Sequence, residues 1–234
     1  MINLKNFRRV LTFFAHPDDE TLAAGATISK LTHYGVDVHI AIPATGIHSR
    51  RNLSEKNERD ISLISLRKDC EKAMSVLGIP PANIYLGEFA DNEMDKFSLL
   101  EIVHWFEKIL NKVKPDLILT HHRFCTNIDH RYCHEAAVIA TRPSYGSNNR
   151  TILCGEVPSS TGYLRPAQWE PNCYIEVSES NLELKIKAMQ TFENEARKDP
   201  HPRSPEVLKA LAKVRGSESG FYYAESFMIQ KIMG

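Results

Sequence analysis

Short, nearly continuous apolar runs alternate with amphipathic segments of helical period through the first two thirds of this 234-residue chain. Apolar runs of this length are typical of strands buried on both faces, which occur mainly in parallel sheets that helices cover. Consecutive parallel strands need a right-handed crossover, and an intervening helix supplies it. The pattern therefore predicts an α/β fold with a doubly wound, mostly parallel sheet and helices on both faces.

The expected strands and helices can be located from these apolar patterns and from their stop signals. Strands are expected at residues 10–15, 36–42, 84–86, 116–120, 151–157 and 173–177. Helices are expected at residues 21–34, 58–77, 97–113 and 181–197, and a further helix is expected to begin within 127–135 and to run through 136–140. Gly35 and Gly78 follow two of these helices, at the position where a C-terminal cap favours glycine. This order predicts a Rossmann-like core.

The alternation changes after about residue 145, where Ser, Pro and Gly become frequent between the last two expected strands. The proline-rich segment 200–205 is expected to be a stiff loop, because each proline fixes its own φ and restricts the residue before it. We therefore expect a single domain, 1–234. Its core would span about 8–145, and its C-terminal part, about 146–234, would cap the core with loops, short strands and helices that shape a substrate pocket.

Composition narrows the range of partners. The 29 Lys+Arg balance the 29 Asp+Glu, so the chain has no strong field to attract nucleic acid or an acidic membrane surface. No apolar stretch approaches the roughly 20 residues of a membrane-spanning helix. The five cysteines form no Cys-x-x-Cys pair, which favours reduced thiols in the cytoplasm over disulfides. The prediction is a cytoplasmic protein with a small-molecule partner and a possible homo-oligomeric state.

The segment His16-Pro17-Asp18-Asp19-Glu20 stands where the first expected strand ends and the first helix begins. In open α/β sheets, ligands bind beyond the carboxyl ends of the strands, so this cluster is placed for function. A helix N-cap explains one aspartate, because capping needs a single carboxylate. It does not explain the histidine and the second aspartate, so we favour a functional site.

A second cluster, Asn127-Ile128-Asp129-His130, follows the strand at 116–120 and lies on the same edge of the sheet. His16, Asp19 and His130 can occupy three corners of a tetrahedron and leave the fourth open, which is the pattern of catalytic zinc. Fe²⁺ or Co²⁺ would accept the same donors. Joint binding by His130 and His134, one helical turn apart, is disfavoured because Arg131 replaces the glutamate of zincin helices.

Both clusters resemble motifs of a known family. The segment 16–20 resembles the signature of the PIG-L/LmbE-like family of zinc-dependent N-deacetylases, and Asp129-His130 resembles the family's second motif. The resemblance covers at least residues 8–142. It implies a metal-dependent hydrolase that removes the acetyl group from an N-acetylated, N-acetylglucosamine-like sugar conjugate. It also implies zinc ligands and a general base for a zinc-activated water, namely His16, Asp19 and His130 as ligands and Asp18 as base.

One position departs from the family pattern. Asn127 stands where many members carry a histidine, and an amide can donate a hydrogen bond to an oxyanion but cannot supply a proton. Either Asp18 acts as both acid and base, or another imidazole approaches, the candidates being His121, His122 and His134. Asp129, the second predicted catalytic residue, would orient a neighbouring side chain such as a catalytic imidazole, or it would cap the following helix.

Substrate contacts are the least specified part of the site. Arg67, Arg50 and Asn127 are the expected substrate-binding residues, and Trp169 and Tyr163 can stack on a sugar ring. Two alternatives stay open. One is an amidase acting on another N-acyl small molecule such as an antibiotic, and the other is a catalytically weak, zinc-containing sugar-binding protein.

Overall fold

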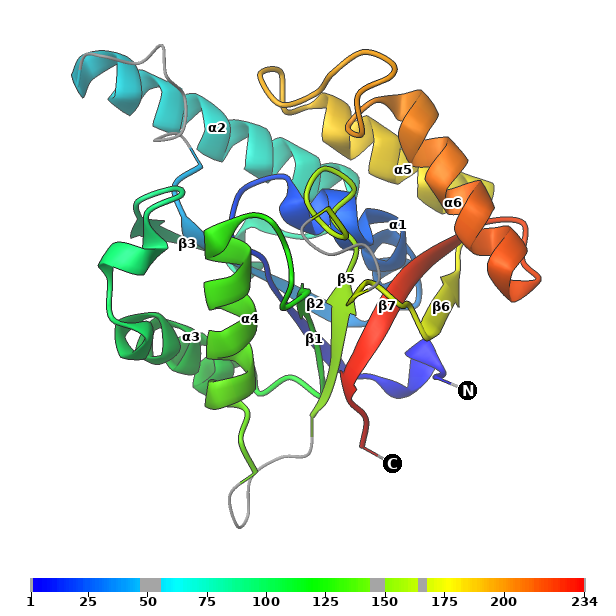
Figure 1. Ribbon diagram of the computed structural model, residues 1–234, viewed down its shortest axis with the longest axis horizontal. Coiled ribbons are helices and arrows are strands. Elements are labelled where there is room, and N and C mark those ends of the chain that lie inside the picture. Colours follow the sequence, from blue (N-terminus) through cyan, green and yellow to red (C-terminus); the bar gives the residue numbers. More distant parts are fainter. Residues whose placement is uncertain (1, 47–55, 144–149, 164–167, 234) are drawn as a thin grey trace.

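One sheet of seven strands forms the centre of the computed structural model, which describes residues 2–46, 56–143, 150–163 and 168–233 (Figure 1). The strands lie in the order β3-β2-β1-β4-β5-β7-β6. Their bounds are β1 Arg9–Phe13, β2 Asp37–Ala44, β3 Ile84–Phe89, β4 Leu117–His121, β5 Thr151–Gly155, β6 Cys173–Glu176 and β7 Ala224–Lys231. The helices are α1 Asp19–His33, α2 Lys56–Val76, α3 Leu99–Val113, α4 Ile128–Ala140, α5 Glu179–Gln190 and α6 Pro205–Ser219, with short 3₁₀ turns at Leu4–Asn6, Pro81–Asn83 and Met94–Lys96.

The first five strands of this order are parallel, and β7 runs antiparallel to both of its neighbours. In the register of the sheet, Val10 of β1 stands beside Val38 of β2 and beside Leu117 of β4. The chain leaves β1 towards β2 and β3, and later returns to the other side of β1 as β4. The predicted doubly wound, mostly parallel α/β sheet is confirmed.

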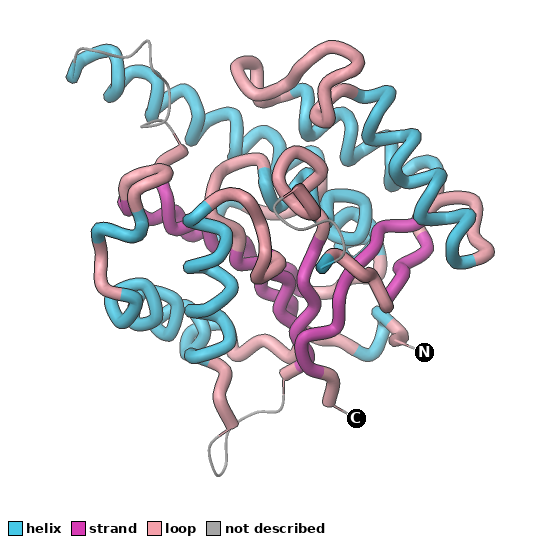
Figure 2. Tube along the Cα trace, viewed as in Figure 1, coloured by secondary structure: helices cyan, strands magenta, loops and turns pink. Residues whose placement is uncertain are grey.

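Helices cover both faces of the sheet, and the two layers are seen on either side of the strands (Figure 2). Helices α1, α2 and α5 share one core cluster with Val10, whereas α3 and α4 share the other with Leu11 and Phe13. Alternate side chains of β1 thus enter opposite cores, and the Phe13 ring stacks on Phe106 with 3.9 Å between centroids. Within the described ranges, no helix is long and apolar enough to cross a membrane.

The C-terminal part differs from expectation in its elements. The helix expected to reach residue 197 ends at Gln190, where the Thr191 hydroxyl bonds to the Ala188 carbonyl and a run of turns begins. Helix α6 and strand β7 were not predicted, although Ser204 and Pro205 at the start of α6 and Gly220 after its end are ordinary boundary signals. The part therefore extends the sheet as well as covering the core.

A buried ion pair fastens this C-terminal part to α1. The Lys185 ammonium donates to Glu225 Oε1 at 2.6 Å and to the Leu22 carbonyl at 2.7 Å, and both charged side chains are about 5% exposed. The backbone N–H groups of Ala26 and Thr27 donate to the Glu225 carboxylate at 3.1 and 2.7 Å. Charged groups from α5 and β7 therefore bond directly to the backbone of α1, the helix that begins at Asp19.

Candidate metal centre and catalytic cleft

The predicted site lies where the chain changes direction across the sheet. The loop at 14–18 joins the carboxyl end of β1 to α1, and the loop at 122–127 joins the carboxyl end of β4 to α4. Strands β1 and β4 are neighbours, yet their connections lead to opposite faces of the sheet. Such a switch point leaves a crevice between the two loops, which is where open α/β sheets bind ligands.

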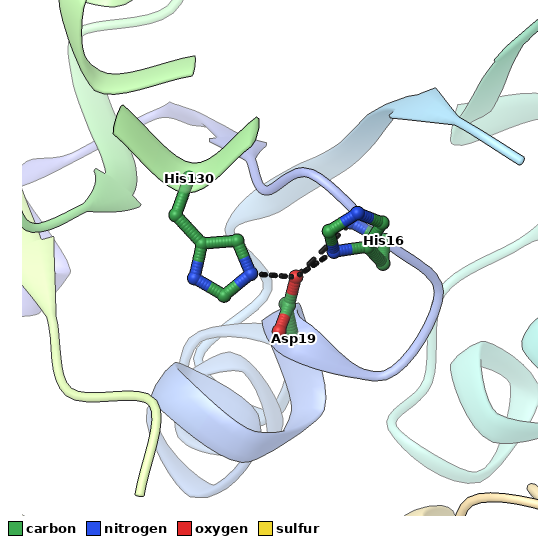
Figure 3. A group of neighbouring side chains, drawn as sticks. All are labelled: His16, Asp19 and His130. Carbon is green, nitrogen blue, oxygen red and sulfur yellow. Dashed lines mark hydrogen bonds and ion pairs between the residues drawn. The ribbon is translucent and has the colours of Figure 1, made fainter. Parts of the chain in front are cut away.

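Three predicted ligands converge in this crevice (Figure 3). His16 Nδ1 and His130 Nε2 each lie 3.0 Å from the same oxygen, Oδ2 of Asp19. One ligand atom from each residue lies within 4.8 Å of the others, and all three side chains are buried. Two imidazole nitrogens and one carboxylate oxygen at this spacing form a donor set for a divalent cation such as Zn²⁺, Fe²⁺ or Co²⁺.

The protonation of these groups indicates a site suited to positive charge. Burial lowers the pKa of His130, but the charge of Asp19 and contact with Cys125 raise it to about 9. Burial also lowers the pKa of His16, and hydrogen bonds with Asp129 and Asp19 raise it well above its ordinary value. Burial raises the pKa of Asp19, whereas the His130 charge holds it well below its usual range. The Asp19 carboxylate thus favours the protonated, positively charged form of the His16 and His130 rings. A divalent cation fits the same donor atoms.

Asp129 lies behind His16 and is completely buried. Its Oδ2 lies 3.0 Å from His16 Nε2 and accepts a hydrogen bond from the Asn92 backbone N–H at 2.6 Å. Its Oδ1 accepts a hydrogen bond from the Met94 backbone N–H at 3.1 Å. Asp91 Oδ1 contacts the same His16 nitrogen at 3.0 Å. A carboxylate on the second ring nitrogen fixes the tautomer of a metal-binding histidine, so this position suits a residue that orients His16.

Asn127, and not Asp129, caps α4. The Asn127 Oδ1 accepts a hydrogen bond from the Asp129 backbone N–H at 2.8 Å, and the alternative that Asp129 is the cap is wrong. The Asn127 Nδ2 donates to Asn92 Oδ1 at 2.9 Å, and the residue lines the same cleft as the candidate metal ligands. Both ends of this amide are therefore already hydrogen-bonded.

Asp18 combines a strained backbone with a buried charge. Its φ is +123°, a value that non-glycine residues rarely adopt, and its side chain makes no cap hydrogen bond. The carboxylate is 2% exposed and lies 3.0 Å from Arg203 Nη1, which also pairs with Glu195. Burial raises the pKa of Asp18, and the Arg203 charge opposes this shift without cancelling it. Strain of this kind is found where a side chain must be presented to a ligand.

Arg203 is a site residue that the sequence analysis missed. It comes from the turns after α5, a segment expected to be partly helix and partly a stiff loop. The same segment brings Glu195, Arg197 and His201 to the cleft. The available signal was indirect: a buried pair of adjacent aspartates needs a cation nearby, and no arginine close in sequence supplies one.

None of the three histidines offered as alternatives for the missing imidazole is among the described residues that line the cleft. His121 stacks on His130 with 3.7 Å between ring centroids. Its Nε2 accepts a hydrogen bond from the Ala15 backbone N–H at 2.7 Å, so this ring packs against a candidate ligand. Burial lowers the pKa of His122 to about 4, and its ring contacts Trp169. His134 Nδ1 bonds to the His121 carbonyl at 2.9 Å.

Besides the candidate ligands His16 and His130, the described residues that line the cleft include one further imidazole, His201. Its Nδ1 accepts the Arg203 backbone N–H at 3.1 Å, so a neutral ring carries its proton on Nε2. The loop that holds it was expected at 200–205 and begins three residues after the end of the expected helix at 197. Sequence reasoning named no role for this histidine, because nothing local indicates that the loop reaches the candidate metal ligands.

The cleft has a volume of about 380 Å³ and is lined mainly by polar groups. Arg67, a predicted substrate contact, is not among the described lining residues; its guanidinium donates to the Gly87 carbonyl at 3.2 Å. Arg50 lies outside the described residues. The stacking candidates Trp169 and Tyr163 also lie away from the described lining. Of the predicted substrate-binding residues, the structure brings Asn127 to the site.

The chain is similar in sequence to known proteins. Residues 11–141 match the PIG-L family model, described as GlcNAc-PI de-N-acetylase. The chain is 25% identical over 228 residues to the diacetylchitobiose deacetylase of Thermococcus kodakarensis. This match covers 93% of this chain and 81% of that protein. It is 34% identical over 116 residues to the probable N-acetyl-alpha-D-glucosaminyl L-malate deacetylase 2 of Bacillus cereus, which covers 48% of this chain and 51% of that protein.

The fold is similar to that of the N,N′-diacetylchitobiose deacetylase from Pyrococcus horikoshii complexed with its inhibitor MPG. The TM-score is 0.77 at 24% identity, and the match covers 97% of this chain and 85% of that one. The family match at 11–141 contains both loops that carry the candidate metal ligands.

Proposed function

Because the chain belongs to the PIG-L family of GlcNAc-PI de-N-acetylases, we propose that it removes the acetyl group from an N-acetylated amino-sugar conjugate with the help of a divalent metal. The family resemblance and the N-deacetylase class inferred from the sequence are confirmed. The observation that carries the proposal is the convergence of two imidazoles on Asp19, with the carboxylate of Asp18 beside them in a polar cleft.

His16, Asp19 and His130 are the proposed ligands, and their donor atoms suit Zn²⁺ or a similar divalent ion. A cation bound there supplies Lewis acidity, which polarises an acetamide carbonyl and makes a water molecule easier to deprotonate. Asp129 and Asp91 hold the His16 ring from behind, so that Nδ1 faces the other two ligands.

Asp18 is the proposed general base. It lies in the cleft one residue before a metal ligand, and the Arg203 contact holds its carboxylate in one orientation. Asp18 accepts a proton from water as the water oxygen adds to the amide carbon. The carbon–nitrogen bond then breaks while the nitrogen gains a proton, and the products are acetate and a free amine.

Asp18 is the proposed source of the proton for the amine, because it can return the proton that it accepted from water. His201 Nε2–H, on a neutral ring, can donate a hydrogen bond but not a proton. Asn127 can donate only a hydrogen bond, because an amide does not release a proton at neutral pH. Its Nδ2 would have to leave Asn92 to contact a substrate oxyanion.

A sugar ring suits the size and polarity of the cleft. A volume of about 380 Å³ lies at the small end of ligand sites, and amide, hydroxyl and charged groups surround it. The relatives that act on diacetylchitobiose and on N-acetyl-alpha-D-glucosaminyl L-malate support an N-acetylglucosamine unit as the reacting group. Arg197 at the cleft is placed to meet an anionic group of the conjugate.

We place this activity in the cytoplasm, a location that the five buried, unpaired cysteines support. A homo-oligomeric state stays a prediction. So do the substrate contacts of Arg67 and Arg50.

The test is acetate and amine release by purified protein reconstituted with Zn²⁺, Fe²⁺ or Co²⁺. The substrate panel is N-acetylglucosamine, diacetylchitobiose, an anionic N-acetylglucosamine conjugate and an N-acyl antibiotic. We expect hydrolysis of the N-acetylglucosamine compounds, and loss of hydrolysis in Asp18→Asn with the metal still bound. Cleavage of the antibiotic alone would support an amidase of another class, and metal binding without any cleavage would support a sugar-binding protein.

A further inference from the structure

The two histidines of the metal centre are held from behind by different chemistry. A metal-binding histidine usually donates its second ring N–H to a carboxylate, a backbone carbonyl or water. His16 follows this rule, since its second nitrogen faces Asp129 and Asp91. His130 instead faces the thiol of Cys125, with Nδ1 3.2 Å from Sγ, and the Ser160 hydroxyl at 3.3 Å.

The direction of the hydrogen bond between His130 Nδ1 and Cys125 Sγ follows from which nitrogen of the ring would bind the metal. His130 Nε2 points to Asp19 Oδ2, so Nε2 is the nitrogen that can bind a cation and must then carry no proton. A neutral imidazole has one N–H, which leaves the proton on Nδ1. Nδ1–H therefore donates, and Cys125 Sγ is its nearest partner.

The other hydrogen-bond partners of the Cys125 sulfur leave it able to accept a hydrogen bond from His130. The Cys125 thiol donates to Ser160 Oγ at 3.3 Å, which uses its single proton. Thr161 Oγ1 lies 3.3 Å from the sulfur and accepts the Val157 backbone N–H at 3.0 Å. The Thr161 hydroxyl proton is then available to the sulfur, which can accept from Thr161 and from His130.

The sulfur also lies at the junction of two loops. The Thr126 backbone N–H and its hydroxyl both bond to the Ser160 carbonyl at 3.1 Å, which joins the loop after β4 to the loop after β5. Cys125 precedes Thr126 and has no exposed surface. A group fixed in this way can hold the His130 ring in one rotation.

We propose that Cys125 is the positioning residue of His130: its sulfur accepts the Nδ1–H bond, directs Nε2 towards the metal position, and ties this ligand to the loop after β5. The inference rests on the proposed metal-dependent function and names a partner for one of its ligands. It is specific to this side chain, because Cys133 is equally buried on the same helix as His130 without being its hydrogen-bond partner.

The test compares metal affinity in variants of the full chain. Cys125→Ala removes the acceptor, and Cys125→Ser has nearly the same size and restores one. Cys133→Ala is the matched control for lost packing. Each protein is titrated with Co²⁺, and the dissociation constant and the visible Co²⁺ spectrum are measured together with the melting temperature of the metal-free form.

We expect Cys125→Ala to bind Co²⁺ about 10–100-fold more weakly, with an altered spectrum. Cys125→Ser should bind more like wild type than like the alanine variant, and Cys133→Ala should bind like wild type. Equal affinity of Cys125→Ala and wild type would overturn the inference, and so would a loss in Cys125→Ser or in Cys133→Ala as large as the loss in Cys125→Ala. A wild-type protein that binds no Co²⁺, Zn²⁺ or Fe²⁺ would instead overturn the proposed function. Should the alanine variant not fold, Cys125→Val fills the volume without an acceptor and takes its place.

Discussion

Replacing Lys185 with methionine should cost much more stability than removal of an ordinary surface lysine. Methionine has a similar length and fills the space beside α1, so the substitution mainly removes the charge. It leaves Glu225 buried, and among the described residues the N–H groups of Ala26 and Thr27 remain as its hydrogen-bond partners. It also removes the ammonium that bonds to the Leu22 carbonyl at 2.7 Å.

The magnitude follows from the burial of both partners. Lys185 and Glu225 are about 5% exposed, and removal of one partner of a buried pair typically costs about 3–5 kcal/mol of unfolding free energy. For a chain of this size, about 1 kcal/mol corresponds to about 2–4 °C in melting temperature, so Lys185→Met should melt roughly 10 °C lower. The free energy of unfolding is measured by urea denaturation of the metal-free protein, with calorimetry for the melting temperature.

Two comparisons separate the charge effect from general damage. Lys209→Met breaks the pair with Glu179 at 3.1 Å, in which both side chains are half exposed, and should leave stability unchanged within error. Lys185→Met combined with Glu225→Gln should cost less than the sum of the single changes, because the double variant no longer buries an unpaired charge. The reasoning is refuted if Lys185→Met resembles Lys209→Met, or if the two single costs simply add.

Further outcomes are expected at the cleft and beside it. Asp18→Asn should lower acetate release by about a hundredfold or more while the metal still binds, because an amide cannot accept the proton of water; unchanged turnover would exclude Asp18 as the base. Arg203→Met should lower turnover more than the affinity for metal, since it frees the Asp18 carboxylate at the cleft; calorimetric metal titration beside the acetate assay checks this split. Prolonged chelation should abolish hydrolysis and lower the melting temperature, and added Zn²⁺ should restore both, with about 2.7 kcal/mol of stabilisation at a free metal concentration of 100 Kd. Burial, followed by the charge of His134, lowers the pKa of His122 from 6.5 to about 4. The stability that depends on neutral His122 is therefore complete above about pH 6.5 and is lost as the pH falls towards 4; urea unfolding at stepped pH should show a smaller acid loss in His122→Phe.

Local patterns in the sequence were enough to predict the parallel part of the sheet. The run that forms β1 is apolar on both faces, and α3 begins at a Ser98–Glu101 capping box and presents one apolar stripe. The position of the two loops that carry the candidate metal ligands follows from the rule that the carboxyl ends of parallel strands share one edge of the sheet. His16 and Asp19 come from one such loop and His130 from another, so their meeting was predictable without coordinates.

The contacts that could not be predicted join residues remote in the chain. Arg203, in the turns after α5, meets Asp18, and Glu225 meets the middle of α1 because β7 returns into the sheet. Helix α6 was missed because few of its residues are buried, so its apolar period is faint. Cys125, the partner of His130, was missed for another reason. A single cysteine in a sequence is usually interpreted as a buried core residue, because its neighbours in the fold are not known.

At position 18 of this enzyme, thermal stability and catalytic turnover favour different residues. A residue held at φ +123° costs on the order of 1–3 kcal/mol, and glycine would adopt the same angle without that cost. Glycine would also relieve the crowding of two neighbouring aspartates. A library selected only for survival of heating would therefore favour glycine at this position. Because Asp18 is the proposed general base, we expect such a screen to enrich inactive proteins, and thermal engineering of this chain should hold Asp18 constant from the first round.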